Sequence, residues 1–421
     1  MPGPTLKLLP STTPGVMAAK LLLPLGSRCD AVNERGSHQL LASCLSRGCG
    51  PMDHLQLADL VEGRGAGLRS EANEDGLLIS LRCTLEDADS LLPLLGWMVT
   101  SPLLEEEQVE LERSLSLQAL QRQKEDPFQV GFDAWRQLVY GNGPYGHDPL
   151  GIREDLEELN VDRIRSLATR LPSGHAVLVL AGQWPMGLDE SLPEQLGWAD
   201  WPRDSEATPP QGSAPWKPQG QSRITTTRMD TEQVVITLGQ PCCPHGHPDD
   251  LALRLLQCHL GSGMSSLLFR RLREEHGVAY DVGAHLPTRA GAAPFVVHAS
   301  SSADRAELAL SLLMDSWQEL SHTTLTQSEL DLARAKFRGQ IAHGRQTCSQ
   351  KAERCAQLLG FGLPEHHDQN CLEALDALTS EQLRQAARRW LQQPHLSLCG
   401  PDDSLGRMER WWNGDQSDGS S

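Results

Sequence analysis

Short apolar runs alternate along the chain with longer stretches in which apolar residues recur every three or four positions. The runs around Leu21–Leu25 and Ala176–Ala181 have the length of buried strands. The apolar spacing at Leu40–Leu45 and Leu255–Leu260 is helical instead. The pattern therefore predicts a chain that mixes strands and helices throughout.

The first half of the chain shows the order in which these elements are expected. The predicted elements are strands at Val16–Leu25, Gly67–Ala72, Gly76–Cys83 and Ala176–Ala181, and helices at about His38–Ser46, Leu85–Thr100 and Glu105–Lys124. Because the strands follow one another without regular βαβ alternation, we expect an α+β fold, in which helices cover one face of a mostly antiparallel sheet.

Features of the first half recur in the second half in the same order, about 215–219 residues later. The matched pairs are the apolar helices Leu40–Leu45 and Leu255–Leu260, their ends near Gly48 and Gly263, the helix caps Asn160 and Thr379, and the strands Ala176–Ala181 and His395–Gly400. Asn and Thr are both favoured N-cap residues. The repetition indicates an internal duplication that yields two homologous domains.

The length of the chain also points to two domains. Its 421 residues exceed what a single hydrophobic core usually organises. Residues 202–221 are rich in proline and glycine and poor in apolar side chains, which is typical of a surface linker. We therefore predict an amino domain at 1–201, the linker at 202–221, a homologous carboxy domain at 222–412 and a disordered tail at 413–421.

The formal net charge of the chain is −18. Nucleic-acid binding is not expected, because the chain lacks a basic stripe that would neutralise phosphates. Two interpretations of the acidic surface stay open, namely simple solubility and an acidic cavity for basic peptides.

Eleven cysteines are scattered along the chain without any C-x-x-C pair. This pattern argues against a disulfide framework or a structural zinc site and favours a reducing compartment. The amino terminus has neither a secretory nor a transit pattern, and the apolar runs are too short to span a bilayer. We expect a cytoplasmic protein without membrane association.

Several segments match one protein family, in the right order, from about residue 15 to residue 400. The matching segments are Gly26–Arg28, Gly36–Gly48, Gly65–Leu68, Pro144–Gly146, Ala176–Gly182, Leu260–Phe269, Leu272–Tyr280 and Glu329–Lys336. Together they resemble the pitrilysin/insulinase family of zinc metallopeptidases, which includes the mitochondrial processing peptidases. The resemblance implies a peptide substrate and a duplicated α+β fold.

Enzymes of the resembled family bind zinc through an H-x-x-E-H helix and a further glutamate about seventy-six residues later. Two histidines four positions apart lie on one helical face and can reach a single ion. The corresponding positions here are Gln39, Ala42, Ser43 and Ala119. All four depart from the pattern, so the resemblance implies no zinc in this chain and no peptidase activity of the chain alone.

Relocated ligands do not restore a zinc site in this sequence. His38 is one residue out of place, which rotates it about 100° around the helix. The Cys242–His247 segment is dense in potential ligands, but we interpret it as an ordinary strand-to-helix connection with adventitious metal affinity at most. Cys44, on an apolar helix, is expected to be a small core residue.

A second constellation of the family is present. We expect Ser265 and Ser266 to cap a helix that ends at Gly277 in the left-handed conformation. The apolar face of this helix would contain Met264, Leu267, Leu268 and Leu272. A strand should then run from Val278 to Val282. This arrangement would bring Arg273 and Tyr280 together. In the resembled family such a pair donates hydrogen bonds to the substrate carbonyl near the scissile bond.

Two loops complete the comparison. Gly261, Ser262 and Gly263 lack the lysine of a P-loop and correspond to a loop that recognises substrate or subunit in the resembled family. Residues 65–70 correspond to an edge strand that pairs with substrate backbone, but Arg69 and Ser70 stand where the family typically shows Asn-Ala.

Our leading hypothesis is a non-catalytic subunit that forms a heterodimer with a zinc-bearing homologue and completes its peptide chamber, with the zinc held by the partner. The alternative is a structural or scaffold homologue without a proteolytic role. An independent zinc metallopeptidase is the third possibility, disfavoured by the four replaced positions.

Overall fold

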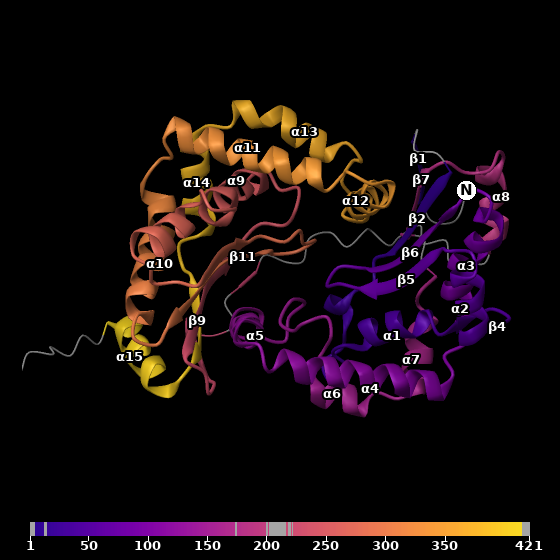
Figure 1. The fold of residues 1–421 in the computed structure, drawn as a ribbon, viewed down its shortest axis with the longest axis horizontal. Helices are drawn as coiled ribbons and strands as arrows, with labels where there is room; N and C mark the ends of the chain where they lie inside the picture. The colour runs from indigo at the N-terminus through magenta and orange to yellow at the C-terminus, as the bar shows by residue number, and fades with distance from the viewer. Residues whose placement is uncertain are drawn as a thin grey trace, which may run out of the picture. The chain divides into compact units, whose positions relative to one another are not determined.

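The computed structural model of the chain describes residues 5–11, 15–172, 175–198, 201, 216–217, 220 and 222–414. They form two compact units, each with its own five-stranded sheet (Figure 1). Unit 1 comprises Met1–Gln121, His147–Gln211 and Ala342–His367, and unit 2 comprises Arg122–Gly146, Gly212–Ile341 and Asp368–Ser421. Most of the predicted linker 202–221 lies outside the described residues.

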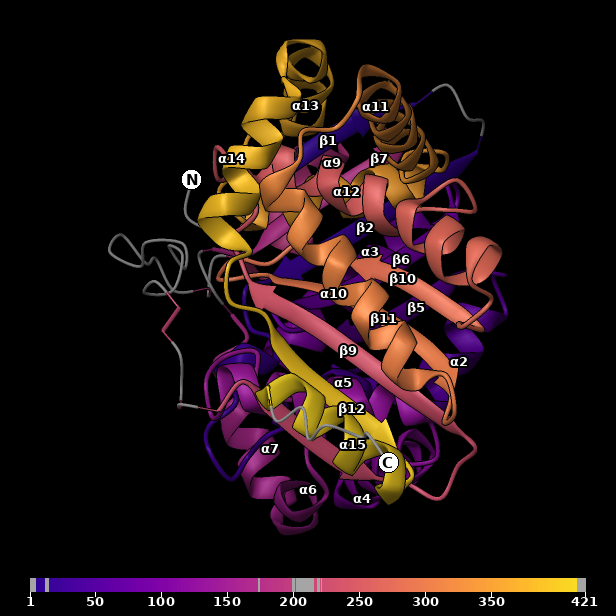
Figure 2. The ribbon, with the colours of Figure 1, turned by 90° about the vertical axis from the view of Figure 1, so that its left-hand side faces the viewer.

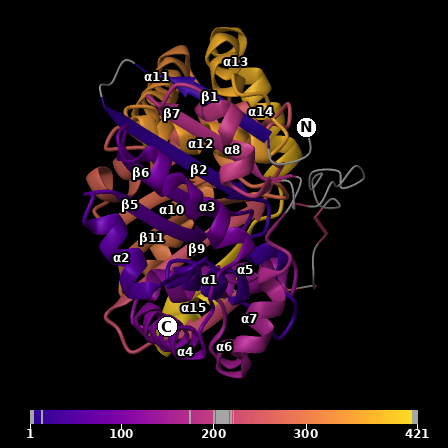
Figure 3. The same cartoon turned by 90° about the vertical axis from the view of Figure 1, so that its right-hand side faces the viewer.

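The sheet of unit 1 has the strand order β1-β7-β2-β6-β5 (Figure 3). Its strands are β1 (Thr5–Pro10), β2 (Val16–Leu23), β5 (Gly67–Ala72), β6 (Leu77–Thr84) and β7 (Val177–Gly182). Strand β1 runs parallel to β7, and the other neighbours are antiparallel. A two-stranded ribbon, β3 (Gly48–Cys49) and β4 (Met52–Asp53), lies apart from this sheet. Strand β5 forms one edge.

The sheet of unit 2 repeats this topology with the order β8-β12-β9-β11-β10 (Figure 2). Its strands are β8 (Ile224–Arg228), β9 (Gln233–Pro241), β10 (Asp281–His285), β11 (Pro294–Ser302) and β12 (His395–Gly400). Here β8 is parallel to β12, and the other pairs are antiparallel. The two sheets correspond strand for strand in chain order, which confirms the predicted duplication and the α+β fold.

Helices build the main core on one face of each sheet. In unit 1 they are α1 (Ser37–Leu45), α2 (His54–Glu62), α3 (Ala88–Thr100), α4 (Glu106–Gln123), α6 (Arg153–Glu158), α7 (Val161–Ala168) and α8 (Leu188–Gln195). In unit 2 they are α9 (Asp250–Gly261), α10 (Ala306–His322), α11 (Gln327–His343), α13 (His367–Ala374), α14 (Ser380–Trp390) and α15 (Asp402–Asn413). Fully buried leucines such as Leu41 and Leu256 fill these cores.

Each unit also takes one helix from the other half of the sequence. Helix α5 (Pro127–Tyr140) packs on the second sheet, where the buried Trp135 donates from Nε1 to the carbonyl of His395 at 3.1 Å. Helix α12 (Cys348–Gly360) packs on the first sheet through Ala352 and Ala356. The prediction that helices cover one face only is therefore wrong, because each exchanged helix has an apolar face that covers the opposite side of a sheet.

The ends of several elements can be compared with their predictions. Asn160 and Thr379 are side-chain N-caps, as expected; the Asn160 side chain accepts from Arg163 N at 3.0 Å. Strand β2 ends at Leu23, two residues earlier than predicted. Helix α15 continues to Asn413, so the predicted tail does not begin there, and residues 415–421 lie outside the described range.

Candidate functional site

The four positions that correspond to the family's zinc site carry side chains with other roles or with no ligand atom. Gln39 accepts a hydrogen bond from Ala72 N at 2.8 Å through Oε1. Ala42 is fully buried, and Ala119 offers only a methyl group. Among the described residues, no cluster of three His, Cys, Asp or Glu ligand atoms lies at these positions. The residues present do not fit a zinc ion.

The hydrogen bond of Gln39 also changes the edge of the first sheet. Among the described strands, β5 pairs with β6 alone, so its other side carries main-chain groups that a peptide strand could use. One of these groups, Ala72 N, is taken by Gln39. On the same strand, Arg69 and Glu71 form an ion pair of 2.6 Å between exposed side chains. The edge is thus partly occupied by this chain's own side chains.

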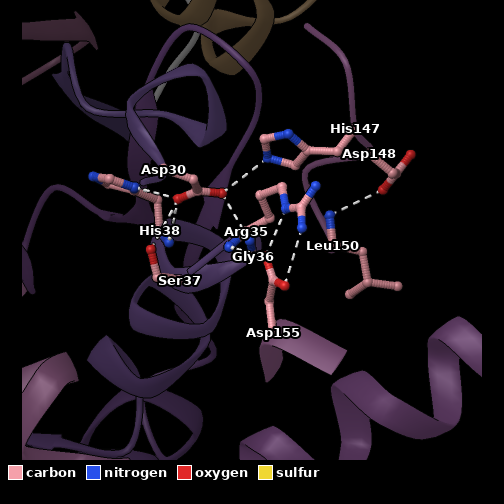
Figure 4. A network of polar contacts seen from close by, with 9 residues as sticks. All are labelled: Asp30, Arg35, Gly36, Ser37, His38, His147, Asp148, Leu150 and Asp155. Carbon is pink, nitrogen blue, oxygen red and sulfur yellow. Dashed lines mark hydrogen bonds and ion pairs between the residues drawn. The ribbon is translucent and has the colours of Figure 1, made fainter. Parts of the chain in front are cut away.

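A buried polar network surrounds Asp30, just before α1 (Figure 4). The Asp30 carboxylate is fully buried and accepts from Gly36 N at 2.7 Å and Ser37 Oγ at 2.9 Å. Its oxygens lie 2.6 Å from His38 Nδ1 and 3.1 Å from His147 Nε2. Burial by itself raises the pKa of Asp30, but the hydrogen bonds from His147 and His38 outweigh burial and lower this pKa to about 2.

This network explains how α1 begins. Gly36, at the N-cap, has φ +99 and lies against the main chain of Leu150 and Gly151, so a side chain there would clash. Because Gly36 has no side chain to cap the helix, Asp30 supplies the acceptor for the free N–H groups. His38 is therefore a partner of Asp30, and its place off the ligand position agrees with the prediction. Sequence reasoning missed Asp30, since nothing in the spacing links it to His147.

A second ion pair fixes the same region of unit 1. Arg35 Nε donates to Asp155 Oδ2 at 2.6 Å, and Arg35 N donates to the same oxygen at 3.0 Å. Burial raises the pKa of Asp155, but its hydrogen bonds and charge pairing with Arg35 lower it overall. The segment before α1 is thus tied to α6.

The other candidate ligands have structural roles. Cys44 is buried, and burial raises the pKa of its thiol to about 12, as expected for a core residue. In the Cys242–His247 segment, His245 Nδ1 lies 2.7 Å from Asp250 Oδ2. Arg254 pairs with the same carboxylate at 3.0 Å. All eleven cysteines are free thiols.

The segment that carries Arg273 differs in detail from its prediction. Leu267, Leu268 and Leu272 are buried as expected, but Met264 is 74% exposed and does not belong to the apolar face. Residues Phe269–Glu275 form a π-helix that continues a helical turn at Leu267 and Leu268, so the helix begins directly after Ser266. Capping by the Ser265 and Ser266 hydroxyls stays a prediction.

The π-helix ends as the sequence predicts, but the next strand begins later. Gly277 is left-handed with φ +61, and Val278 N donates to Leu272 O at 2.8 Å. This bond holds Val278 in the turn, so β10 begins at Asp281 instead of Val278.

Arg273 and Tyr280 both lie on the surface of unit 2. The guanidinium carbon of Arg273 is 4.7 Å from the centre of the Phe269 ring. Tyr280 is 60% exposed, and its main-chain N donates to Ser300 O. Within the described part of the chain, neither the guanidinium nor the phenol has a hydrogen-bond partner. In the described part of the chain, the side chains of Arg273 and Tyr280 form no hydrogen bond with each other.

The Gly261–Gly263 loop follows α9 directly. Gly261 lies so close to β10 that a Cβ would come within 2.2 Å of Ala284 N. Gly263 has φ +74, and Ser262 Oγ accepts from Gln340 Nε2 at 3.4 Å. The loop is therefore held against β10 and α11.

A family model described as "Peptidase M16 inactive domain" matches residues 194–337. This part of the chain is thus similar to the inactive domain of the M16 peptidases. This result confirms the resemblance to the pitrilysin/insulinase peptidases.

Relatives and solved structures match almost the whole length of this chain. Proteins named as uncharacterized zinc proteases from Streptomyces coelicolor and Mycobacterium tuberculosis are 24% and 22% identical, over 95% and 96% of this chain and 88% and 93% of theirs. The crystal structure of a peptidase M16 inactive domain from Pseudomonas fluorescens has a TM-score of 0.85 at 21% identity, with 95% of this chain and 96% of that chain covered. A protease from Helicobacter pylori has a TM-score of 0.86 at 18% identity, with 95% and 98% covered. These two structures show the shared fold.

The helices were also compared with the requirements of a membrane span. Within the described ranges, none combines the length and the apolar character needed to cross a bilayer.

Proposed function

We propose that this chain is the non-catalytic subunit of a heteromeric M16 peptidase. It would pair with a zinc-bearing homologue, complete that partner's peptide chamber and contribute Arg273 and Tyr280 to substrate binding. The zinc and the metal-activated water would belong to the partner subunit. The chain by itself would not hydrolyse peptides.

The observation that carries the proposal is the contrast between two sets of positions. The zinc positions hold Gln39, Ala42, Ser43 and Ala119, whose side chains have no means to bind the ion together. Arg273 and Tyr280, in contrast, keep exposed hydrogen-bond donors without a partner among the described residues. Free donors of this kind can bind a peptide carbonyl and stabilise negative charge that develops on it.

The edge of the first sheet supports the same division of labour. A peptide that adds to β5 would need its main-chain donors, and Gln39 already bonds to Ala72 N. We infer that the partner subunit holds the substrate backbone by strand addition, while this chain supplies side-chain donors.

We place the complex in the cytoplasm. All eleven cysteines are free thiols, and most are buried, which suits a reducing compartment.

The test is to purify the chain with a zinc-bearing M16 homologue and to measure cleavage of a quenched fluorescent peptide. We expect a stable complex whose activity exceeds that of the homologue alone. Arg273→Ala and Tyr280→Phe should each lower kcat about 10–1000-fold without changing assembly, because each removes one donor to the developing charge. The matched control is Arg270→Ala, an exposed arginine of the same π-helix, which should leave kcat within about twofold.

Two results would contradict the proposal. One is the absence of any complex or of any gain in activity when the two subunits are mixed. The other is an active complex in which Arg273→Ala and Arg270→Ala behave alike. A stable complex without peptidase activity would favour the scaffold alternative.

A further inference from the structure

Unit 2 contains a cavity of about 480 Å³ that the proposed peptide contacts do not use. It lies among α10, the segment that follows α14, the end of α15 and the residue before β8; the three helices lie on the same side of the second sheet (Figure 1). The volume is within the range of small-molecule sites in proteins.

The floor of this cavity is apolar and rigid. Trp317 is nearly fully buried and donates from Nε1 to Leu391 O at 2.9 Å. Leu391 and Pro394 are buried beside it, and Met314 completes the floor from α10. Because the indole is fixed by this hydrogen bond, the floor is formed before any ligand arrives.

The rim of the cavity combines flat aromatic surface with positive charge. Trp411 and Trp412, at the end of α15, are half-buried, so each keeps part of its indole open. The Arg223 guanidinium carbon is 5.9 Å from the centre of the Trp412 ring. His322 is bonded through Nδ1 to Gln318 O at 2.7 Å, which leaves Nε2 as its other polar atom.

The charge of the lining identifies the kind of ligand. The chain has a net charge of −18, yet none of the described residues that line this cavity is acidic. Arg223 is the permanent cation of the lining, and its guanidinium has no carboxylate partner in the described part of the chain. An anion on the ligand can therefore pair with Arg223 without competition from a neighbouring Asp or Glu.

We propose that this cavity binds an aromatic carboxylate. The ring would stack on the indoles of Trp411 and Trp412 above the Trp317 floor, and the carboxylate would accept from Arg223. The ligand is either a small aromatic acid or the C-terminal aromatic residue of a peptide, since both present the same ring and carboxylate. This binding site is independent of the proposed partnership with a zinc-bearing subunit.

The test uses N-acetyl-L-phenylalanine and its neutral amide, titrated into the full-length chain by isothermal calorimetry. We expect saturable binding of the acid, with the amide about tenfold weaker because it lacks the charge-assisted bond to Arg223. A short peptide that ends in phenylalanine, with a free or an amidated C-terminus, separates the two sources. Tighter binding of the free-ended peptide than of the amino acid assigns the site to peptides, and the reverse assigns it to small acids.

Single-residue variants test whether the aromatic acid binds in this cavity. Arg223→Gln should weaken the acid about tenfold and leave the amide unchanged, whereas Trp412→Ala should weaken both. The matched control is Arg410→Gln, which removes a positive charge from α15 outside the cavity and should change neither affinity. Arg223 is exposed, so its variant tests the site even where Trp412→Ala fails to fold.

Three results would overturn the proposal. They are the absence of saturable binding of the acid or the peptide, equal affinity for acid and amide, and affinities that Arg223→Gln and Arg410→Gln change alike. Protection of Trp411 and Trp412 from acrylamide quenching by a partner protein, without binding of the acid, would likewise overturn it and make the cavity an interface.

Discussion

Replacing Asp30 by asparagine gives a sharp test of how unit 1 is stabilised. The carboxylate is fully buried and accepts hydrogen bonds from two main-chain N–H groups, a hydroxyl and two imidazoles. The asparagine side chain would keep one acceptor oxygen and would place an NH₂ group against donors. The substitution therefore removes charge-assisted bonds and leaves buried donors without a partner.

The magnitude follows from the pKa. Lowering the pKa of Asp30 from its ordinary 3.8 to about 2 corresponds to about 2.4 kcal/mol, at about 1.36 kcal/mol per tenfold change in proton affinity. Breaking a buried charged network from one side typically costs about 3–5 kcal/mol. We expect Asp30→Asn to lower the free energy of unfolding of unit 1 by about 3 kcal/mol.

The assay is urea unfolding at pH 7, followed by circular dichroism and tryptophan fluorescence. Asp59→Asn, on the exposed face of α2, is the matched control and should change the free energy of unfolding by less than about 0.5 kcal/mol. Equal unfolding midpoints for the two variants would refute the reasoning.

The same carboxylate gives a signed pH dependence. Because the folded pKa is lowered, Asp30 contributes its stability above about pH 3.8 and loses it as the pH falls toward 2. Acid unfolding of the wild-type chain should include this loss, and the Asp30→Asn variant should lack it. A variant with the same dependence between about pH 4 and pH 2 as the wild type would contradict the assignment.

Three further predictions concern the exchanged helices and the sheet edge. Trp135→Ala should lower the free energy of unfolding of unit 2 by about 3–5 kcal/mol in urea titrations, since the fully buried indole anchors α5. Lys20→Met should stay within about 1 kcal/mol of wild type in the free energy of unfolding. Glu353→Ala should cost about 2 kcal/mol, because the buried Lys20 ammonium, 2.7 Å from the partly exposed Glu353 carboxylate, would lose its counter-charge. Equal effects of the two variants in thermal unfolding would contradict this. Gln39→Leu should speed hydrogen exchange of the Ala72 amide measured by mass spectrometry, with unchanged exchange counting against the contact.

Local patterns proved reliable for the elements and for their repetition. The apolar spacing of α1, the caps Asn160 and Thr379 and the left-handed Gly277 depend on neighbours within a few residues, and all agree with the structure. The prediction that Met264 is buried failed. Its spacing fits an apolar helix face, yet it lies in the turn before the helix and is 74% exposed.

The candidate site depends both on the residue types in the sequence and on the packing of the folded chain. The loss of the zinc ligands at Gln39, Ala42, Ser43 and Ala119 is a matter of side-chain chemistry and can be read from the sequence. That Gln39 bonds to an edge strand thirty-three residues away could not be read there, because the contact depends on how α1 packs against β5.

The sequence by itself determined the helices and strands with clear apolar spacing, their duplication and the residue types at the family's zinc positions, because each rests on side-chain chemistry and short spacings. Only the tertiary structure decided that α5 and α12 each cover a sheet from the other half of the chain, that Asp30 joins His38 to His147, and that three tryptophans and Arg223 enclose a cavity. The physical reason is the same in each case. Burial and hydrogen bonding act between groups that are close in space, and the distance along the chain does not reveal which groups those are.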